Sequence, residues 1–373
     1  MAQHFFLSAE AHDLSLDELY AMGPKEQFRL LARARWGSET EQACPRCGVF
    51  RSHRFKAKRQ RWRCRDCDHE FTITSGTIFH ASKLPLRKLL AVAWFFTRTA
   101  NSTSAIELSF HIGVKVVTAW LLWQKLREVA TRTMSREPLS GVVEADGGYF
   151  GGKPRRSRVR QKTTPAAIQA VVAAGRLNGL QKARNHGISR RNAKKKKRRR
   201  SVMCLRQRSN IKGAGAVRTF AWVALTENSQ HIEPIVVRMV APGSLLVTDE
   251  GSGFSTLKAH FEHEVVPHAE CYATASGVNQ NQAESYNARL RRMERTHHGV
   301  RPEHLASLAA QAARLEDCRR MTARKSFLHL LSDCCLVKHS MWWRGWHQKT
   351  RRQKEVLCDQ FDPRDLCKRQ KPS

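Results

Sequence analysis

The sequence predicts an α/β protein of several domains, in which a mixed sheet with flanking helices follows a four-cysteine zinc ribbon and a helix-turn-helix. Three observations support this prediction. Two Cys-x-x-Cys pairs lie between residues 44 and 67, a short and a longer helical pattern meet at a glycine at position 113, and β-branched segments alternate with helical ones from residue 141 onward. With 373 residues, 41% of them hydrophobic, the chain is long enough for more than one core.

These patterns divide the chain into five segments. We expect an N-terminal helical segment over 1–43, the zinc ribbon over 44–80, the helix-turn-helix over 83–132, the α/β domain over 140–330 with a basic insert at 153–200, and a basic extension over 331–373. Three tryptophans of the extension could stack on bases, but packing inward is the commoner arrangement for them: Trp342, Trp343 and Trp346.

The charge of the chain predicts a polyanionic partner. Its formal net charge is +34, from 66 Lys and Arg against 32 Asp and Glu. Nucleic acid fits best, because acid-poor stretches are spread over several regions, and an anionic membrane surface is the alternative. The sequence has no run of about 18 apolar residues and no signal peptide pattern, and its cysteines are scattered or grouped with metal spacing. We therefore expect a cytoplasmic protein with no membrane partner.

The cysteine pairs predict a metal site. Sixteen residues separate the two pairs, a spacing that lets two knuckles fold back around one tetrahedral zinc ion. Because thiolates fill all four positions, the zinc is expected to be structural, with no open coordination site. His53 and His69 are possible substitute ligands, although bystander positions are more common. The predicted ligands are Cys44, Cys47, Cys64 and Cys67.

Residues 104–131 predict a helix-turn-helix. A short helical pattern over 104–112 is followed by a turn around Gly113 and a longer helical pattern over 115–131. In this arrangement the second helix places residues near its start at DNA bases, here Lys115 and Thr118. Helix pairs joined by a glycine turn are common, so the adjacent basic ribbon segment strengthens this interpretation.

The insert is a second basic feature. Residues 153–200 contain 18 Lys or Arg and no Asp or Glu. Such a segment is a solvated loop, a clamp on the DNA backbone, or both. We predict phosphate contacts for its densest run: Lys194, Lys195, Lys196, Lys197, Arg198, Arg199 and Arg200.

Three carboxylates stand out in the α/β domain. Asp146 follows the apolar part of the first strand, just before an expected glycine turn, and Asp249 ends the fourth strand. Glu284 lies in the first turn of a later helix, for which Asn281 is the expected N-cap. Each acid alone could be an ordinary turn or capping residue. Together they fit a ribonuclease H-like sheet, in which the first and fourth strands are neighbours and a later helix crosses their ends.

Such a cluster of acids predicts metal-ion chemistry. Three neighbouring carboxylates repel one another unless they hold hard divalent cations. Two Mg²⁺ or Mn²⁺ ions about 3.5 to 4 Å apart activate a water or a 3′-hydroxyl and stabilise the leaving oxygen at a phosphodiester. No nucleotide cofactor is expected, because GGYFGG lacks the lysine and hydroxyl order of a phosphate-binding loop.

The order CPRCG and CRDC, helix-turn-helix, ADGGYFGG, VTDE and NQAESYNARLRRMERTHH resembles the DDE transposases of bacterial insertion sequences, in the branch with an N-terminal zinc ribbon. The resemblance implies that Asp146, Asp249 and Glu284 are the metal-binding catalytic acids. It makes Asn281 an alternative third ligand, because some relatives use asparagine there. Where the family often has a lysine after the acid, this chain offers Arg291 and Arg292 as phosphate contacts.

The resemblance also implies a reaction and its partners. It implies binding to double-stranded DNA at the terminal inverted repeats of an insertion sequence, release of 3′ ends and strand transfer into target DNA. A homodimer assembled on DNA in the bacterial nucleoid is expected. The alternatives are a catalytically inactive or domesticated DNA-binding regulator and a non-mobile nuclease on the same fold. A protein that only binds DNA has no need to keep three acids together, so the acids distinguish these functions.

Overall fold

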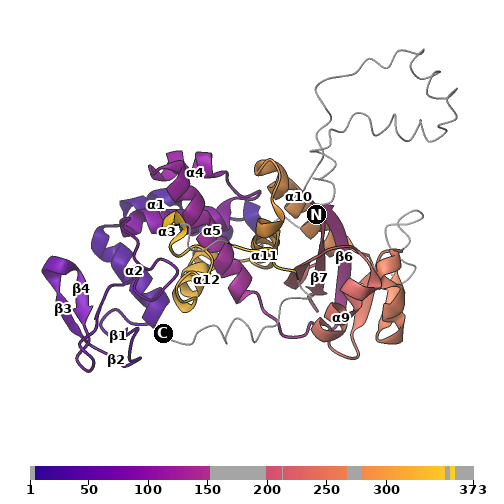
Figure 1. Cartoon of the computed structure of the whole chain (residues 1–373), viewed down its shortest axis with the longest axis horizontal. Helices are drawn as coiled ribbons and strands as arrows, with labels where there is room; N and C mark the ends of the chain where they lie inside the picture. Colours follow the sequence, from indigo (N-terminus) through magenta and orange to yellow (C-terminus); the bar gives the residue numbers. More distant parts are fainter. Residues whose placement is uncertain (1–4, 152–198, 212, 267–278, 349–352, 358–373) are drawn as a thin grey trace, which may run out of the picture.

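The computed structural model describes residues 5–151, 199–211, 213–266, 279–348 and 353–357. A ribbon of short strands and a group of helices form one end of the molecule, and a five-stranded sheet with helices forms the other (Figure 1). The first half of the chain comprises α1 (Leu16–Ala21), α2 (Pro24–Trp36), β1 (Gln42–Ala43), β2 (Phe50–Arg51), β3 (Arg54–Lys56), β4 (Arg61–Arg63), β5 (Glu70–Phe71), α3 (Leu86–Arg98), α4 (Ala105–Ile112) and α5 (Val116–Thr133).

The second half carries the sheet and its helices. Short 3₁₀ turns lie in the first half at Phe5–Leu7, Ala9–His12 and Ala57–Arg59, and in the second half at Trp346–Gln348. The main elements are β6 (Val142–Phe150), β7 (Arg200–Arg208), β8 (Ala216–Ala224), α9 (Ser229–Met239), β9 (Leu245–Thr248), the 3₁₀ helix η4 (Ser252–Ala259), β10 (Glu262–Val265), α10 (Asn281–Thr296), α11 (Pro302–Asp317) and α12 (Ala323–Leu336).

The sheet has the strand order β10-β9-β6-β7-β8. β6 pairs in parallel with β9 and antiparallel with β7, so the first and fourth strands of the domain are neighbours. One face of the sheet buries its apolar residues with α9 and η4, and the other face buries them with α10 and α11. The predicted mixed sheet with flanking helices is therefore confirmed.

Three details of the predicted domain were wrong. The segment GVVEADGGYF (141–150) forms the first strand from Val142 on, as its pattern predicts, but the expected glycine turn after Asp146 is absent because Gly147 and Gly148 pair with β7. The sequence FSTLKAHFEH (254–263) predicts an α-helix after Asp249, but this segment forms the 3₁₀ helix η4, and its last two residues belong to β10. The N-cap of α10 is Gln280, so Asn281 is the first helical residue.

The helix-turn-helix pattern folds as two helices that meet at 107°. Ser104 begins α4 by accepting a hydrogen bond from the amide of Glu107, and Gly113 ends it in the left-handed conformation at φ 59°. An angle near 107° is typical of this motif. Within the described ranges, no helix by itself is long and apolar enough to cross a membrane, and α4 and α5 reach that length and composition only as a bent pair.

The chain returns to its N-terminal helices at α12. This helix packs on α2 and α3, and Phe327, Leu330 and Leu331 lie in the same core as the residues of those helices. Figure 1 shows α12, in yellow, among the indigo and purple N-terminal elements. Beyond it, Trp343 is buried and lies edge-on to Trp120 of α5, with 5.1 Å between ring centroids.

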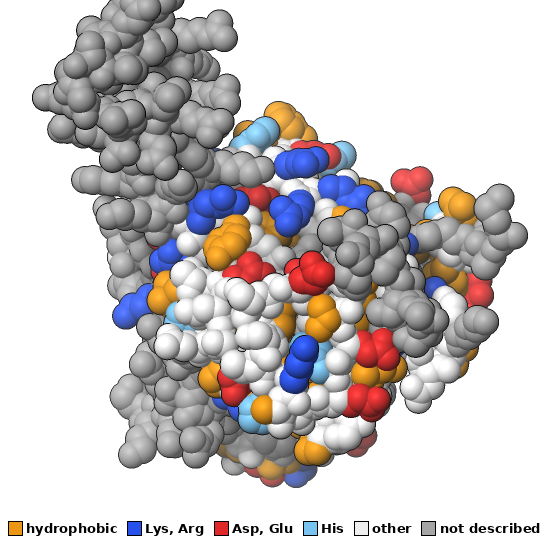
Figure 2. Space-filling model, turned by 90° about the vertical axis from the view of Figure 1, so that its right-hand side faces the viewer, with side chains coloured by type: hydrophobic (Ala, Val, Ile, Leu, Met, Phe, Trp, Pro, Cys, Tyr) orange, Lys and Arg blue, Asp and Glu red, His pale blue; other side chains and the backbone are white. Residues whose placement is uncertain are grey.

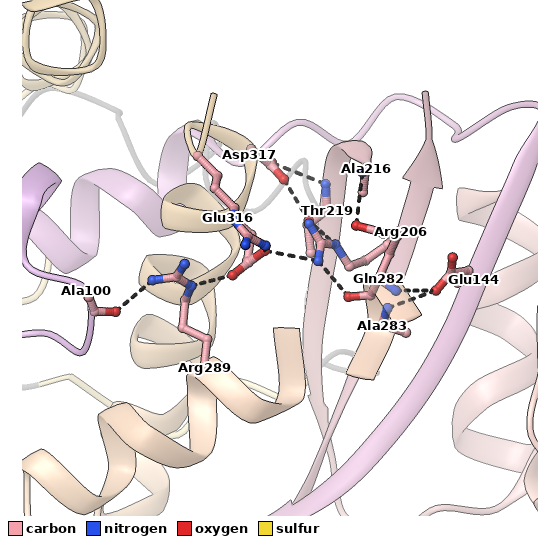
Figure 3. Close-up of polar contacts among 11 residues, drawn as sticks. Ala100, Glu144, Arg206, Ala216, Thr219, Gln282, Ala283, Arg289, Glu316 and Asp317 are labelled. Carbon is pink, nitrogen blue, oxygen red and sulfur yellow. Dashed lines mark hydrogen bonds and ion pairs between the residues drawn. The ribbon is translucent and has the colours of Figure 1, made fainter. Parts of the chain in front are cut away.

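A buried carboxylate fixes α10 on the sheet. Glu144 of β6 accepts hydrogen bonds from the amides of Gln282 and Ala283, both at 2.9 Å (Figure 3). These amides belong to the first turn of α10, where Gln280 provides no side-chain cap. The negative charge also suits the positive end of the helix dipole. On its other side, Glu144 pairs with Arg208 of β7 at 2.5 Å.

A second buried network joins α10 and α11 to the strands. Glu316 of α11 forms ion pairs with Arg206 of β7, at 3.2 Å, and with Arg289 of α10 (Figure 3). Arg206 is only 1% exposed and also donates to the carbonyl of Gln282 at 2.6 Å. Arg289 donates to the carbonyl of Ala100 at 2.7 Å, which ties α10 to the loop before α4.

Arg127 of α5 links the helix-turn-helix to α10 and α11. Its Nε donates to Oε1 of Gln311 at 2.8 Å, and its Nη2 lies 2.6 Å from Nε2 of His297, at the end of α10. Burial, followed by the charge of Arg127, lowers the pKa of His297 to about 3. The ring is therefore neutral at physiological pH and accepts the hydrogen bond from Arg127.

The Glu316 network predicts a large stability effect. Glu316→Gln keeps the shape of the side chain but leaves Arg206 and Arg289 without a buried counter-charge, so we expect a loss of about 3 kcal/mol or more in the free energy of unfolding. Urea denaturation measures it. The control is Glu39→Gln, which removes a carboxylate paired with two exposed arginines and should cost about 1 kcal/mol or less. If both variants lost the same free energy of unfolding, the stabilising role of the Glu316 ion pairs would be contradicted.

His297 predicts a loss of stability in acid. Above the ordinary pKa of 6.5 the ring of His297 is neutral in both the folded and the unfolded chain, so its contribution to the free energy of unfolding is fully present. Below that pH the unfolded chain takes up a proton that the folded protein does not, so the free energy of unfolding falls by about 1.4 kcal/mol per pH unit. The difference between wild type and His297→Asn should therefore shrink from pH 7.5 to pH 5 by about 2 kcal/mol. The control is His298→Asn, at an exposed position, and the same slope in both variants would show the prediction to be wrong.

Candidate functional site

The sheet brings two of the predicted acids to one place. Asp146 is half-buried within β6. Two residues before it, Glu144 pairs with Val247 of β9 in the parallel register. The same register, continued by two residues, places Asp249 opposite Asp146. Asp146 therefore lies on β6, and Asp249 directly follows β9 at the carboxyl end of that neighbouring strand.

Hydrogen bonds hold the carboxylate of Asp146. Nδ2 of Asn287 donates to Oδ2 at 2.7 Å, and the amide of Gly147 donates to Oδ1 at 2.6 Å. Burial raises the pKa of Asp146, the like charges of Asp249 and Glu284 raise it further, and these two hydrogen bonds act in the opposite direction. The charges of two other acids therefore act on Asp146.

Gly251 lies against the carboxylate of Asp249. Oδ1 of Asp249 accepts a hydrogen bond from the amide of Gly251 at 3.0 Å. A Cβ atom on Gly251 would lie 2.8 Å from that oxygen, so a side chain there would force the carboxylate to move. The loop after β9 therefore folds tightly around the carboxylate.

The third acid comes from α10. Glu284 is exposed in the first turn of this helix, next to the exposed Asn281, and its charge acts on Asp146. Within the described residues, the three acids do not form a group whose ligand oxygens all lie within 4.8 Å of one another. They are neighbours, but they do not surround one shared point.

Glu227 is a fourth acid at this place, and the sequence did not reveal it. It lies between β8 and α9, directly before the N-cap Asn228, and it looks like an ordinary loop residue there. Its Oε1 lies 2.5 Å from the point where a Cβ on Gly147 would be, so Gly147 leaves the space that this carboxylate occupies. Burial raises the pKa of Glu227, and the charges of Asp249 and Asp146 raise it further.

Asn287 is a second residue that sequence reasoning missed. It lies three residues after Glu284, and this spacing places both side chains on one side of α10. The side chain is 4% exposed, and its Oδ1 has no hydrogen-bond partner although it is buried. Its position three residues after Glu284, in a segment with a helical pattern, could have indicated Asn287 as a site residue.

Basic and aromatic side chains lie beside the acids. The guanidinium of Arg291 is 5.4 Å from the ring centre of Phe150, and that of Arg199 is 5.7 Å from the ring centre of Tyr149. Both aromatic residues belong to the end of β6 that follows Asp146. Figure 2 shows Lys and Arg side chains next to acidic ones on the face at this end of the molecule.

The other predicted phosphate contacts have different positions. Arg292 is exposed on α10. Arg200 pairs with Glu355, with 2.5 Å between Nε and Oε1, so this side chain serves a contact within the protein. The rest of the basic run lies outside the described residues: Lys194, Lys195, Lys196, Lys197 and Arg198.

The start of α5 presents the predicted base-reading residues. Lys115 is the exposed N-cap of α5, and Thr118 is half-buried in its first turn. Both line a groove of about 680 Å³, together with Leu84, Lys88, Ser109, Phe110, Gly113 and Val114. The groove therefore follows the turn between α4 and α5.

The four ribbon cysteines converge on one point. Sγ of Cys44 lies 3.7 Å from Sγ of Cys67, Sγ of Cys47 lies 3.6 Å from Sγ of Cys64, and all four atoms lie within 4.8 Å of one another. These separations fit the edges of a tetrahedron around an ion with zinc–sulfur distances of about 2.3 Å. The buried His53 could form a second group with Cys64 and Asp66, but only the four thiolates give a complete tetrahedral set.

Both the α/β domain and the ribbon match known protein families. Residues 138–313, which run from before β6 into α11, match the ISXO2-like transposase domain family. Residues 25–70, from α2 to β5, match the transposase zinc-ribbon domain family. The chain carries an ISXO2-like transposase domain and a transposase zinc ribbon. This places the acids of β6, β9 and α10 within a transposase domain.

A curated relative of the transposase comes from a mobile element. The chain is 29% identical over 149 residues to an uncharacterized protein in transposable element ISH50 of Halobacterium salinarum. The match covers 39% of this chain and 48% of the relative, so the transposase spans about half the length of the curated relative it matches. No solved structure matches the chain.

The ribbon geometry predicts one zinc ion per chain. Cys64→Ser removes one of four ligands, so we expect the purified variant to lose its zinc and to melt at a lower temperature, because the metal holds the two knuckles together. Mass spectrometry of the metal and thermal denaturation measure both effects. The control is Cys335→Ser, which changes a half-buried thiol of α12 and should keep the zinc. Full zinc content in Cys64→Ser would rule out the four-cysteine site.

Proposed function

We propose that this transposase binds the ends of an insertion sequence and cleaves and joins DNA strands with divalent cations held by Asp146, Asp249 and Glu284. The observation that carries the proposal is the register of β6 and β9, which brings Asp146 and Asp249 together in a transposase domain. The acid of α10 is electrostatically coupled to the same place.

The three acids would hold the divalent cations together. The charges of Asp249 and Glu284 both act on Asp146, so all three carboxylates could serve as ligands at this place. When bound, two Mg²⁺ or Mn²⁺ ions activate the attacking oxygen and stabilise the leaving oxygen at a phosphodiester.

Neighbouring residues would support this chemistry. Asn287 and the amide of Gly147 orient the carboxylate of Asp146. Glu227 lies on the side of Gly147 and could take up the proton that leaves the attacking water or 3′-hydroxyl, a role for which a raised pKa is suitable. Asn281, the alternative third ligand, lies one turn before Glu284 on the same helix.

The surroundings of the acids would receive DNA. Arg291 and Arg199 provide positive charge on both sides of the strand end that follows Asp146. The helix-turn-helix and the basic ribbon would hold the terminal inverted repeat, with Lys115 and Thr118 toward the bases. Joining two ends in concert requires two such sites, so we propose that a homodimer assembles on DNA.

Asp146→Asn tests the catalytic proposal. The amide keeps the shape of the side chain but removes a metal-binding charge worth several kcal/mol in the transition state. We expect Mg²⁺-dependent nicking of end DNA to fall at least about 100-fold, while binding to that DNA stays unchanged. The control is Glu233→Gln, which changes an acid of α9 that pairs with His260. If Asp146→Asn nicks as well as wild type, the mechanism is wrong, and if wild type binds without nicking, the chain is a regulator.

A further inference from the structure

The start of α5 exposes apolar side chains where a soluble helix usually carries polar ones. In the first turn of this helix, Val116 is 42% exposed and Val117 is 56% exposed. On α4, next to the turn, Ile106 is 61% exposed and Phe110 is 81% exposed. The helix-turn-helix therefore exposes four large apolar side chains, which suit an apolar contact.

Only the first turn of α5 is available for such a contact. Farther along the helix, Ala119, Leu122 and Trp123 are buried in the core that α5 shares with α3 and α12. A partner that meets α5 from outside therefore meets its N-terminal residues. In a helix-turn-helix, these are the residues that reach base edges in the major groove of DNA.

The charges at the start of α5 favour a polyanion over a protein partner. The first turn of α5 contains no acid, and its N-cap is Lys115, which provides no side-chain acceptor for the free amides. Acids are the usual residues at this end of a helix, because they suit its dipole. Their absence leaves the helix end, Lys115 and the nearby Lys88 to attract phosphate.

We infer that Val116 and Val117 recognise thymine through its methyl group, so that the DNA site of the transposase carries thymine where the first turn of α5 enters the major groove. A valine side chain cannot hydrogen-bond, and the C5 methyl of thymine is the apolar group that base edges present there. The groove beside the turn, which Lys88, Phe110 and Lys115 line, would take the sugar and phosphate of one strand. This inference rests on the proposed binding to element ends.

Replacing thymine by deoxyuridine tests the inference, because it removes only the methyl groups. The probe is a duplex that carries the DNA next to this gene at one end of the element, made once with thymine and once with deoxyuridine. Wild type should bind the thymine duplex more tightly by about threefold to fourfold for each methyl group it contacts. The double variant V116A/V117A should bind both duplexes equally, with an affinity near that of wild type for the deoxyuridine duplex.

Further measurements separate the possible failures. The matched control is Val237→Ala, which shortens an equally exposed valine on α9 and should keep the thymine preference. If wild type nicks the thymine duplex but binds both duplexes equally, the inference is overturned and the proposed function stands. If wild type binds neither duplex more tightly than random DNA, both the inference and the proposed function fail. If V116A/V117A keeps the thymine preference but changes the oligomeric state in gel filtration, the surface is a protein contact and the inference is overturned.

Discussion

The carboxylate of Glu144 holds the first turn of α10 through two backbone amides, each at 2.9 Å. It lies on β6, two residues before Asp146, so the strand that carries the first acid also positions the helix that carries the third. The position of Glu284, Asn287 and Arg291 relative to Asp146 therefore depends on this contact. Arg208 compensates the buried charge of Glu144, which makes the burial tolerable.

The opposite side of α10 is fixed by the ion pairs of Glu316. Arg206 comes from β7, Arg289 from α10 and Glu316 from α11, so three elements share one buried group of charges. A group of this kind costs desolvation free energy and adds little to stability compared with apolar packing. Its contribution is to geometry, because charged partners tolerate a shift of the helix less well than apolar ones do. Polar contacts thus hold α10 at its first turn, through Glu144, and near its middle, through Arg289.

Much of this arrangement could be predicted from sequence, and the limits have physical reasons. The spacing of Cys44 to Cys67 predicted the ribbon, and the three acids, which together fit a ribonuclease H-like sheet, predicted that the first and fourth strands are neighbours. Glu144, Asn287 and Glu227 could not be found in the same way, because their roles depend on partners far away in the sequence. The glycines after Asp146 looked like a turn, since the strand that pairs with them begins only at residue 200.

The return of α12 to the N-terminal helices has a consequence for the order of folding during synthesis. Phe327, Leu330 and Leu331 complete the core under α2, α3 and α5, although they leave the ribosome some 200 residues after α5. The helix-turn-helix therefore cannot complete its core until the whole α/β domain has been made. A chain that stops before residue 323 would lack this part of the core, so we do not expect premature termination to yield stable fragments that compete with the complete transposase for the ends of the element.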